Sequence, residues 1–219
     1  MPVLPEVALA ALDTASGGAI VAVPPGSRAR HAVLLALHGW GDSPEWECEA
    51  WGALVERRFF VLCPRGALAA GGGYTWRSAA HLAEAVDASL AALGAAFPEH
   101  VDAVRPLLTG FSLGAVWGRE LLARDPTRFS AVVFVEGGYE QAPFASPAAA
   151  RERSLPRLLY ACGQWACTEK ARRLAGRLGA WADVDVVSRP VGHTYGGELF
   201  AAVRRAWPWL VAGDARFAL

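Results

Sequence analysis

Short apolar runs of strand length alternate with segments of helical periodicity along most of this chain. The runs are residues 19–23, 32–37, 59–62, 106–109, 131–135, 158–161 and 184–187. Most are continuously apolar, which is typical of strands that are buried on both faces of a parallel sheet. The sequence therefore predicts an α/β fold, a mostly parallel sheet with helices on both faces that forms a three-layer αβα sandwich.

The segments between these runs have the spacing of helices that pack one face on a sheet. Residues 45–58, 79–97, 115–124 and 197–210 are predicted to be helical, and so is a segment that follows Thr168, a candidate N-cap, and includes Leu174 and Leu178. No internal repeat or linker interrupts the alternation. We therefore expect one domain over residues 1–219.

Composition excludes some classes of partner. Apolar residues make up 53% of the 219 residues and the formal net charge is +0, which gives no indication of nucleic-acid binding. The first 12 residues lack a basic segment followed by a long apolar one, and no apolar stretch is long enough to span a bilayer. These features predict a cytoplasmic protein without a membrane span.

The four cysteines support the same interpretation. Cys48, Cys63, Cys162 and Cys167 lack C-x-x-C spacing and lie mostly in apolar surroundings. Buried free thiols are the expected state for such residues in a reducing compartment. Cys63 and Cys167 are expected near the mouth of the site described below, without a nucleophilic role.

A G-x-S-x-G pattern at residues 110–114 lies between the run 106–109 and the helical segment 115–124. A tight turn between a strand and a helix needs small residues on both sides, and it holds the central serine exposed in a strained conformation. Ser112 is therefore a candidate nucleophile. The alternative is an ordinary turn serine, and the strand and helix around residues 110–114 favour the nucleophile.

Two further motifs follow predicted strands. His38-Gly39-Trp40-Gly41-Asp42 comes after the run 32–37, and Gly192-His193-Thr194-Tyr195 comes after the run 184–187. Ligand sites of parallel sheets lie beyond the carboxyl ends of the strands, where both motifs fall. His193 is the candidate base, with a capping or solvated loop histidine as the alternative, and His38 is expected to be structural.

With these motifs, with CPRGA at 63–67 and with YTW at 74–76, nearly the whole chain resembles the α/β-hydrolase superfamily. It is most similar to the compact phospholipase/carboxylesterase group, which includes acyl-protein thioesterases. The resemblance implies Ser112 as nucleophile and His193 as general base. It also implies an oxyanion hole formed by the backbone N–H groups of Trp40 and Leu113.

The acid of the expected triad is missing from its usual place. Relatives carry an aspartate in a G-x-x-D turn after the strand equivalent to 158–161, where this chain has Ala166. Glu136, at the end of the run 131–135, is the replacement candidate, although it could instead pair with an arginine or face solvent. Glu169 is a second candidate, better explained as a charge at a helix N-terminus, and a Ser–His dyad without an acid also remains open.

Aromatic residues in the loops at the presumed catalytic edge are candidates for substrate binding. Trp40, Tyr74, Trp76 and Trp165 could line a shallow cleft for an apolar acyl or aryl group, or could pack beneath their loops. The loop 137–156 is too short for a sizeable cap domain. Neither a cofactor nor a metal is expected, since the histidines lack the spacing of metal ligands.

The sequence thus favours a serine hydrolase that cleaves a small-molecule carboxylic ester or thioester through an acyl-enzyme. Two alternatives remain. One is an acyltransferase or cyclising thioesterase on the same scaffold, and the other is a catalytically silent hydrolase fold that binds a ligand. The absent G-x-x-D acid is the only support for the last.

Overall fold

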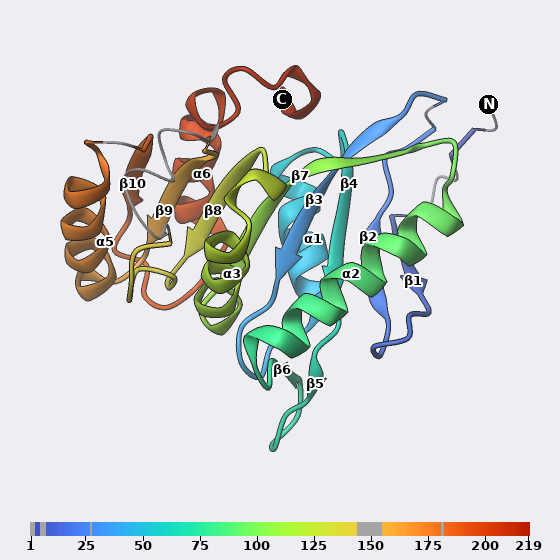
Figure 1. Ribbon diagram of the computed structural model, residues 1–219, viewed down its shortest axis with the longest axis horizontal. Coiled ribbons are helices and arrows are strands. Elements are labelled where there is room, and N and C mark those ends of the chain that lie inside the picture. Colours follow the sequence, from blue (N-terminus) through green and yellow to red (C-terminus); the bar gives the residue numbers. More distant parts are fainter. Residues whose placement is uncertain (1–2, 5–7, 27, 144–154, 181) are drawn as a thin grey trace.

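A computed structural model describes residues 3–4, 8–26, 28–143, 155–180 and 182–219 (Figure 1). Its main sheet has eight strands in the order β1-β2-β4-β3-β7-β8-β9-β10. They are β1 (Leu9–Leu12), β2 (Ala19–Ala22), β3 (His31–Leu37), β4 (Phe60–Pro64), β7 (Val101–Phe111), β8 (Ala131–Val135), β9 (Arg157–Cys162) and β10 (Val184–Ser188). Strands β1 and β2 pair antiparallel, as do β2 and β4, and the other pairs are parallel. The predicted mostly parallel α/β sheet is confirmed.

Helices cover both faces of the sheet (Figure 1). One face carries α2 (Ala79–Ala96), α3 (Leu113–Arg124) and α5 (Trp165–Leu178), and the other carries α1 (Pro44–Leu54) and α6 (Gly197–Leu210). Successive residues of a strand point to opposite faces. Leu35 and Leu37 accordingly pack beneath the first layer of helices, while Leu34 and Ala36 pack beneath the second.

Several element boundaries differ from the sequence prediction. Strand β1 and a hairpin of β5 (Ala67–Leu68) and β6 (Tyr74–Thr75) were not predicted, and β7 starts five residues earlier than the run 106–109. Helix α1 ends at Leu54 because the backbone of residues 56 and 57 has positive φ, which cannot continue a right-handed helix. Helix α5 has Gln164 at its N-cap, so the prediction of Thr168 as the cap was wrong.

The prediction of free cysteine thiols was also wrong. Cys48 on α1 is disulfide-bonded to Cys63 on β4, and Cys162 at the end of β9 is bonded to Cys167 in the first turn of α5. The Cα–Cα distances are 5.8 Å and 5.5 Å, within the range that a disulfide spans. Each pair is brought together by packing of a helix next to a strand, which cysteine spacing alone does not reveal. The cysteines therefore give no support to a cytoplasmic location, which stays a prediction.

Two other expectations concern a cap domain and a membrane span. The predicted lack of a cap rests on the loop 137–156, of which residues 144–154 lie outside the described residues. None of the described helices is both long and apolar enough to cross a membrane.

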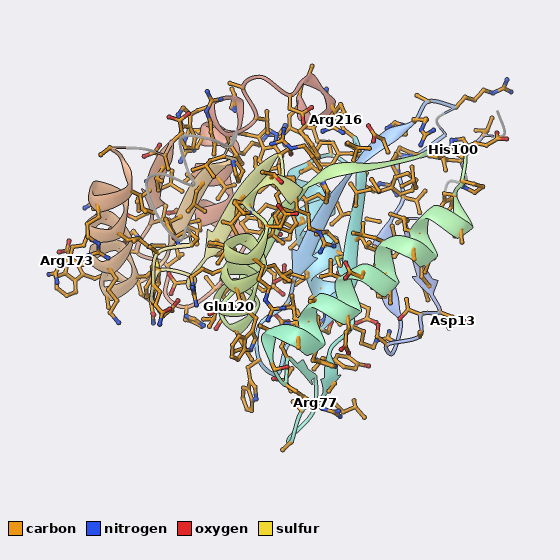
Figure 2. All side chains as sticks on the ribbon, in the orientation of Figure 1. Asp13, Arg77, His100, Glu120, Arg173 and Arg216 are labelled. Atoms are coloured by element: carbon orange, nitrogen blue, oxygen red, sulfur yellow. A yellow bond between two sulfur atoms is a disulfide. The ribbon has the colours of Figure 1, made fainter. Side chains whose placement is uncertain are left out.

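The parallel strands give the sheet two chemically distinct edges. Their carboxyl ends lie at the lower edge in Figure 1, where the hairpin β5–β6 and the starts of α3 and α5 also lie. In Figure 2, Arg77 lies at this carboxyl edge, whereas His100 and Arg216 lie at the opposite, amino edge. The predicted catalytic residues Ser112, Glu136 and His193 come after β7, β8 and β10, at the carboxyl edge.

Candidate active site

Ser112 occupies the single-residue turn between β7, which ends at Phe111, and α3, which begins at Leu113. Its backbone has φ 49° and ψ −115°, a conformation that costs a non-glycine residue about 1–3 kcal/mol. Its N–H donates to the carbonyl oxygen of Val135 on the adjacent strand, at 2.9 Å. The turn thus holds the Ser112 side chain at the carboxyl edge of the sheet.

The two glycines around this turn are required by close backbone contacts. A Cβ at Gly110 would lie 2.8 Å from the backbone of Gly114, and a Cβ at Gly114 would overlap the carbonyl oxygen of Leu37. Real Cβ atoms do not approach so closely. The G-x-S-x-G pattern is therefore explained by packing of the turn against itself and against β3.

Glu136 follows the neighbouring strand β8 in the same way as Ser112 follows β7. Phe111 and Val135 are register partners, so Ser112 and Glu136 are the residues that follow a paired position on β7 and β8. Glu136 also has a positive φ, 54°, and its N–H donates to the carbonyl oxygen of Ala161 at 3.0 Å. Two neighbouring strands are therefore each followed by a non-glycine residue with positive φ.

The Glu136 side chain is completely buried and fully hydrogen-bonded. Its exposed fraction is 0%. Oε1 accepts hydrogen bonds from the backbone N–H groups of Gly163 and Gln164, the latter at 3.0 Å. Charge-assisted hydrogen bonds of this kind offset the cost of burying a carboxylate. Among the described residues, no arginine pairs with Glu136, and its side chain does not face solvent.

His193 connects the side chains of Ser112 and Glu136. It lies in the loop between β10 and α6, with Nδ1 at 3.1 Å from Oε2 of Glu136 and Nε2 at 3.0 Å from Oγ of Ser112. A carboxylate only accepts hydrogen bonds, so Nδ1 carries the proton and Nε2 is free to accept one from the serine hydroxyl. The His193 side chain is 45% exposed, so the row Glu136–His193–Ser112 runs from a buried carboxylate to a partly exposed imidazole and a hydroxyl.

The histidine loop is tied to the loop that follows β3. The Tyr195 hydroxyl donates to Oδ1 of Asp42 at 3.2 Å, and the Tyr195 ring packs against that of Phe111. Burial raises the pKa of the Asp42 carboxyl above its ordinary value, although hydrogen bonds from Ser43 and Tyr195 oppose the shift. This contact fixes the two segments on either side of Ser112 relative to each other.

The loop after β3 lies directly on the serine turn. A Cβ at Gly39 would be 2.9 Å from the Phe111 ring and 3.3 Å from Cβ of Ser112. His38 is buried, with Nε2 accepting from the Gly66 N–H at 3.1 Å and Nδ1 donating to the Gly39 carbonyl at 2.8 Å. Burial lowers the pKa of His38 to about 4, so the ring is neutral near pH 7. His38 therefore supports the loop, as expected.

The N–H groups that were predicted to form an oxyanion hole belong to Leu113 and Trp40. Leu113 is the first residue of α3, so its N–H has no acceptor within the helix. Trp40 follows Gly39 in the loop that packs on Ser112. Both N–H groups belong to segments that touch the serine turn, and their role in binding an oxyanion stays a prediction.

The four candidate aromatic residues differ in exposure. Trp40 is 65% exposed and Trp165 is 78% exposed, while Tyr74 is half-buried. Trp76 is only 3% exposed, stacks on the His38 ring and donates its indole N–H to the His38 carbonyl. Trp76 therefore packs beneath the loop, and Trp40 and Trp165 are the ones that present an apolar surface to solvent.

Other candidates lie apart from the row. Glu169, the second candidate for the acid, faces Arg173 one turn along α5 at 3.9 Å. One group of potential metal ligands, Glu136 with Cys162 and Cys167, is close enough to hold an ion, but both sulfur atoms are in the disulfide. Sequence reasoning missed Gly163 and Gln164 as the donors that hold Glu136, because backbone N–H groups leave no sequence signature.

The sheet order, the parallel strands β3, β4 and β7 to β10, and the serine at the turn between β7 and α3 define an α/β-hydrolase fold. The sequence matches no protein-family model and no curated protein sequence. Solved structures with the same fold are nevertheless numerous.

Three of these structures illustrate the similarity. A carboxylesterase from Bacillus cereus is 18% identical, with a TM-score of 0.60 and coverage of 85% of this chain and 91% of the other. A carboxylesterase from Mesorhizobium loti is 21% identical, with a TM-score of 0.59 and coverage of 97% and 99%. FphF, a fluorophosphonate-binding serine hydrolase from Staphylococcus aureus, is 13% identical, with a TM-score of 0.62 and coverage of 93% and 97%. At these identities the likeness establishes the fold.

Proposed function

We propose that this protein is a serine hydrolase that cleaves a carboxylic ester or thioester through an acyl-enzyme. The observation that carries the proposal is the continuous hydrogen-bonded row from Ser112 Oγ through both ring nitrogens of His193 to Glu136. Solved structures of the same fold that are described as carboxylesterases or as a serine hydrolase support it.

In the proposed mechanism, Ser112 Oγ attacks the carbonyl carbon of the substrate while Nε2 of His193 takes the hydroxyl proton. Glu136 holds the Nδ1 proton and stabilises the imidazolium that forms. The N–H groups of Trp40 and Leu113 would bind the oxyanion, a contribution of about 3 kcal/mol for each donor. His193 then returns its proton to the leaving alcohol or thiol, and water hydrolyses the acyl-enzyme with His193 acting again as base.

The proposed substrate is a small molecule with an apolar acyl or aryl group. Trp40 presents exposed aromatic surface from the loop after β3, and Trp165 does so from the first residue of α5, while Tyr74 on β6 is half-buried. Aromatic surface at a catalytic edge favours apolar over charged groups. Trp76, being buried, would act by supporting the loop of Trp40.

The test is labelling of the wild type and of Ser112→Ala by a fluorophosphonate, measured by intact mass, together with hydrolysis of p-nitrophenyl esters. We expect a single adduct on the wild type, no adduct on Ser112→Ala and loss of hydrolysis in the variant, whose fold is checked by circular dichroism. A wild type that is neither labelled nor active would contradict the proposal and favour a silent, ligand-binding fold.

A further inference from the structure

The turn between β9 and α5 is closed by a disulfide directly beside the proposed acid. Cys162 is the last residue of β9 and Cys167 lies in the first turn of α5, with 5.5 Å between their Cα atoms. Cys162 is 0% exposed and Cys167 1%. Their sulfur atoms and a carboxylate oxygen of Glu136 all lie within 4.8 Å of one another. The residues between the two cysteines are therefore confined next to Glu136.

This closed turn supplies the donors that hold Glu136. The N–H groups of Gly163 and Gln164, the two residues that follow Cys162, both donate to Oε1. No charged side chain is needed for this, and the other carboxylate oxygen, Oε2, faces His193. The position of the Glu136 carboxylate is thus set by the conformation of two residues inside the disulfide loop.

The same turn holds the histidine loop. The carbonyl oxygen of Cys162 accepts from the Arg189 N–H at 3.0 Å. That of Gly163 accepts from the N–H groups of Val191 at 3.1 Å and Gly192 at 3.0 Å. Gly192 directly precedes His193. The disulfide loop therefore contacts both partners of the His193–Glu136 hydrogen bond through backbone groups.

We propose that the Cys162–Cys167 disulfide holds the hydrogen bond between Glu136 and His193 in its catalytic geometry, and that its reduction lowers the activity by disturbing this hydrogen bond. Cys162 and Cys167 are positioning residues, and this inference rests on the proposed hydrolase function. In the redox step, a dithiol reductant gives two electrons and two protons to the disulfide. Two protein thiols form, and the reductant becomes the disulfide.

Reduction changes the space that the two sulfur atoms need. Bonded sulfur atoms are about 2 Å apart, whereas non-bonded heavy atoms settle at about 3.5–4 Å. Because both sulfurs are buried, we expect the turn between them to take up part of the separation. A displacement of about 1 Å of a positioning group can cost about 100-fold in rate. Reduction is therefore expected to lower kcat by about 10- to 100-fold.

The other disulfide provides a matched control. Cys48 and Cys63 are also buried and join a helix to a strand, but their strand, β4, lies on the far side of β3 from the strands that carry Ser112 and Glu136. We would compare the wild type with C48A/C63A, which keeps only the disulfide beside Glu136, and with C162A/C167A, which keeps only the remote one. Each protein is assayed oxidised and after treatment with dithiothreitol.

The assays measure kcat and KM for a p-nitrophenyl ester and the rate of fluorophosphonate labelling. EDTA is present because free thiols beside Glu136 could otherwise bind a metal ion. Reduction of each cysteine pair is quantified by iodoacetamide capture and mass spectrometry. We expect reduction to lower kcat of the wild type and of C48A/C63A by the same factor, with KM nearly unchanged and activity restored on reoxidation. C162A/C167A is expected to be slow in both states.

Glu136→Gln separates positioning from general stability. If the disulfide acts through Glu136, reduction should have little further effect on kcat of this variant. Equal loss of activity in Glu136→Gln would overturn the inference, and so would full activity of the wild type after complete reduction of Cys162 and Cys167. An oxidised wild type without labelling or hydrolysis would instead reject the hydrolase proposal itself, a different result from activity that reduction leaves unchanged.

Discussion

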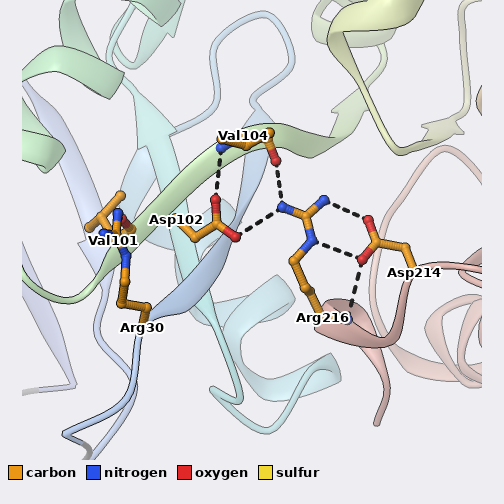
Figure 3. Close-up of polar contacts among 6 residues, drawn as sticks. All are labelled: Arg30, Val101, Asp102, Val104, Asp214 and Arg216. Atoms are coloured by element: carbon orange, nitrogen blue, oxygen red, sulfur yellow. Dashed lines mark hydrogen bonds and ion pairs between the residues drawn. The ribbon is translucent and has the colours of Figure 1, made fainter.

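The two edges of the sheet each carry a network of charged side chains, and the networks differ in how their carboxylates are compensated. At the amino edge, Arg216 binds Asp102 at 3.0 Å, Asp214 at 2.6 Å and the carbonyl oxygen of Val104 (Figure 3). At the carboxyl edge, Glu136 is held by two backbone N–H groups and His193.

This difference decides what each network can do. The guanidinium of Arg216 lowers the pKa of Asp214, and Asp214 in turn raises the pKa of Arg216, so these opposite charges satisfy one another. Amide donors carry no net charge, so the negative charge of Glu136 remains available to stabilise a proton on His193. The Arg216 network, whose opposite charges are paired, therefore stabilises structure. The row from Glu136 through His193 to Ser112 includes an exposed ring and a hydroxyl, which can take part in a reaction.

Removing the charge of Glu136 is the strongest test of this contrast. In Glu136→Gln, the N–H groups of Gly163 and Gln164 keep the amide oxygen at the Oε1 position, so the amide NH₂ faces Nδ1 of His193. Nδ1 then becomes the acceptor and Nε2 carries the proton, the wrong tautomer for a base. We expect kcat/KM for p-nitrophenyl esters to fall about 10³- to 10⁴-fold.

Asp102→Asn is the matched change at the amino edge, and its kcat/KM should stay within about twofold of the wild type. Both variants are checked by circular dichroism. Near-normal hydrolysis by Glu136→Gln would remove the carboxylate from the mechanism and leave a Ser112–His193 dyad.

The neutral state of the buried His38 at the carboxyl edge predicts that acid lowers the stability of the protein. Burial lowers the pKa of His38 to about 4 from an ordinary value of 6.5. The unfolded chain therefore binds a proton between pH 6.5 and 4 that the folded chain does not, and the free energy of unfolding falls as the pH falls through this window. The full contribution of this group is about 3 kcal/mol.

His38→Gln has no titratable group at this position and should lose about that much less stability than the wild type between pH 6.5 and 4. Urea unfolding at several pH values measures the difference, and each protein serves as its own reference at pH 8. Parallel stability curves for the two proteins would mean that His38 is protonated inside the folded protein.

The fold and the membership of the row could be predicted because both leave strong sequence signals. Continuously apolar runs of strand length predicted the parallel sheet, and the glycines around Ser112 predicted the turn between β7 and α3. Glu136 was the acidic residue directly after one of these runs. Because its strand neighbours the one that ends at Ser112, sheet geometry alone brings the two residues to the same edge.

What the sequence could not supply depends on backbone contacts and on packing between distant segments. The donors that hold Glu136 are backbone groups of Gly163 and Gln164, which any residue type provides. The partners of Cys48 and Cys162 follow from a helix lying next to a strand. The start of α5 was misplaced because Thr168 is a good N-cap residue, yet its hydroxyl donates to Gln164 from within the helix.

The exposed tryptophans of the carboxyl edge give a smaller expected effect. Trp165→Ala removes an indole that is 78% exposed in the free protein and that an apolar acyl group would cover in the proposed complex. Loss of that contact is worth about 1 kcal/mol, or about fivefold in kcat/KM for p-nitrophenyl octanoate. The acetate ester, whose acyl chain is six carbons shorter, is the control. Equal loss for both esters would place the effect of Trp165 on Ser112 or His193 instead of on the acyl group.

The smallest effect is expected at the amino edge. Arg216→Ala breaks contacts to Asp102 and Asp214, but the Arg216 side chain is 33% exposed and solvent screens its charge. Partly exposed ion pairs contribute at most about 1 kcal/mol, which corresponds to a decrease in Tm of about 2–4 °C for a chain of this size. The difference should shrink in about 1 M salt, where the screening length is about 3 Å. Hydrolysis should remain within about twofold of the wild type. A larger loss of kcat would mean that the Arg216 network at the amino edge is coupled to the row at the carboxyl edge. That result would contradict the distinction between a structural network and a reactive one.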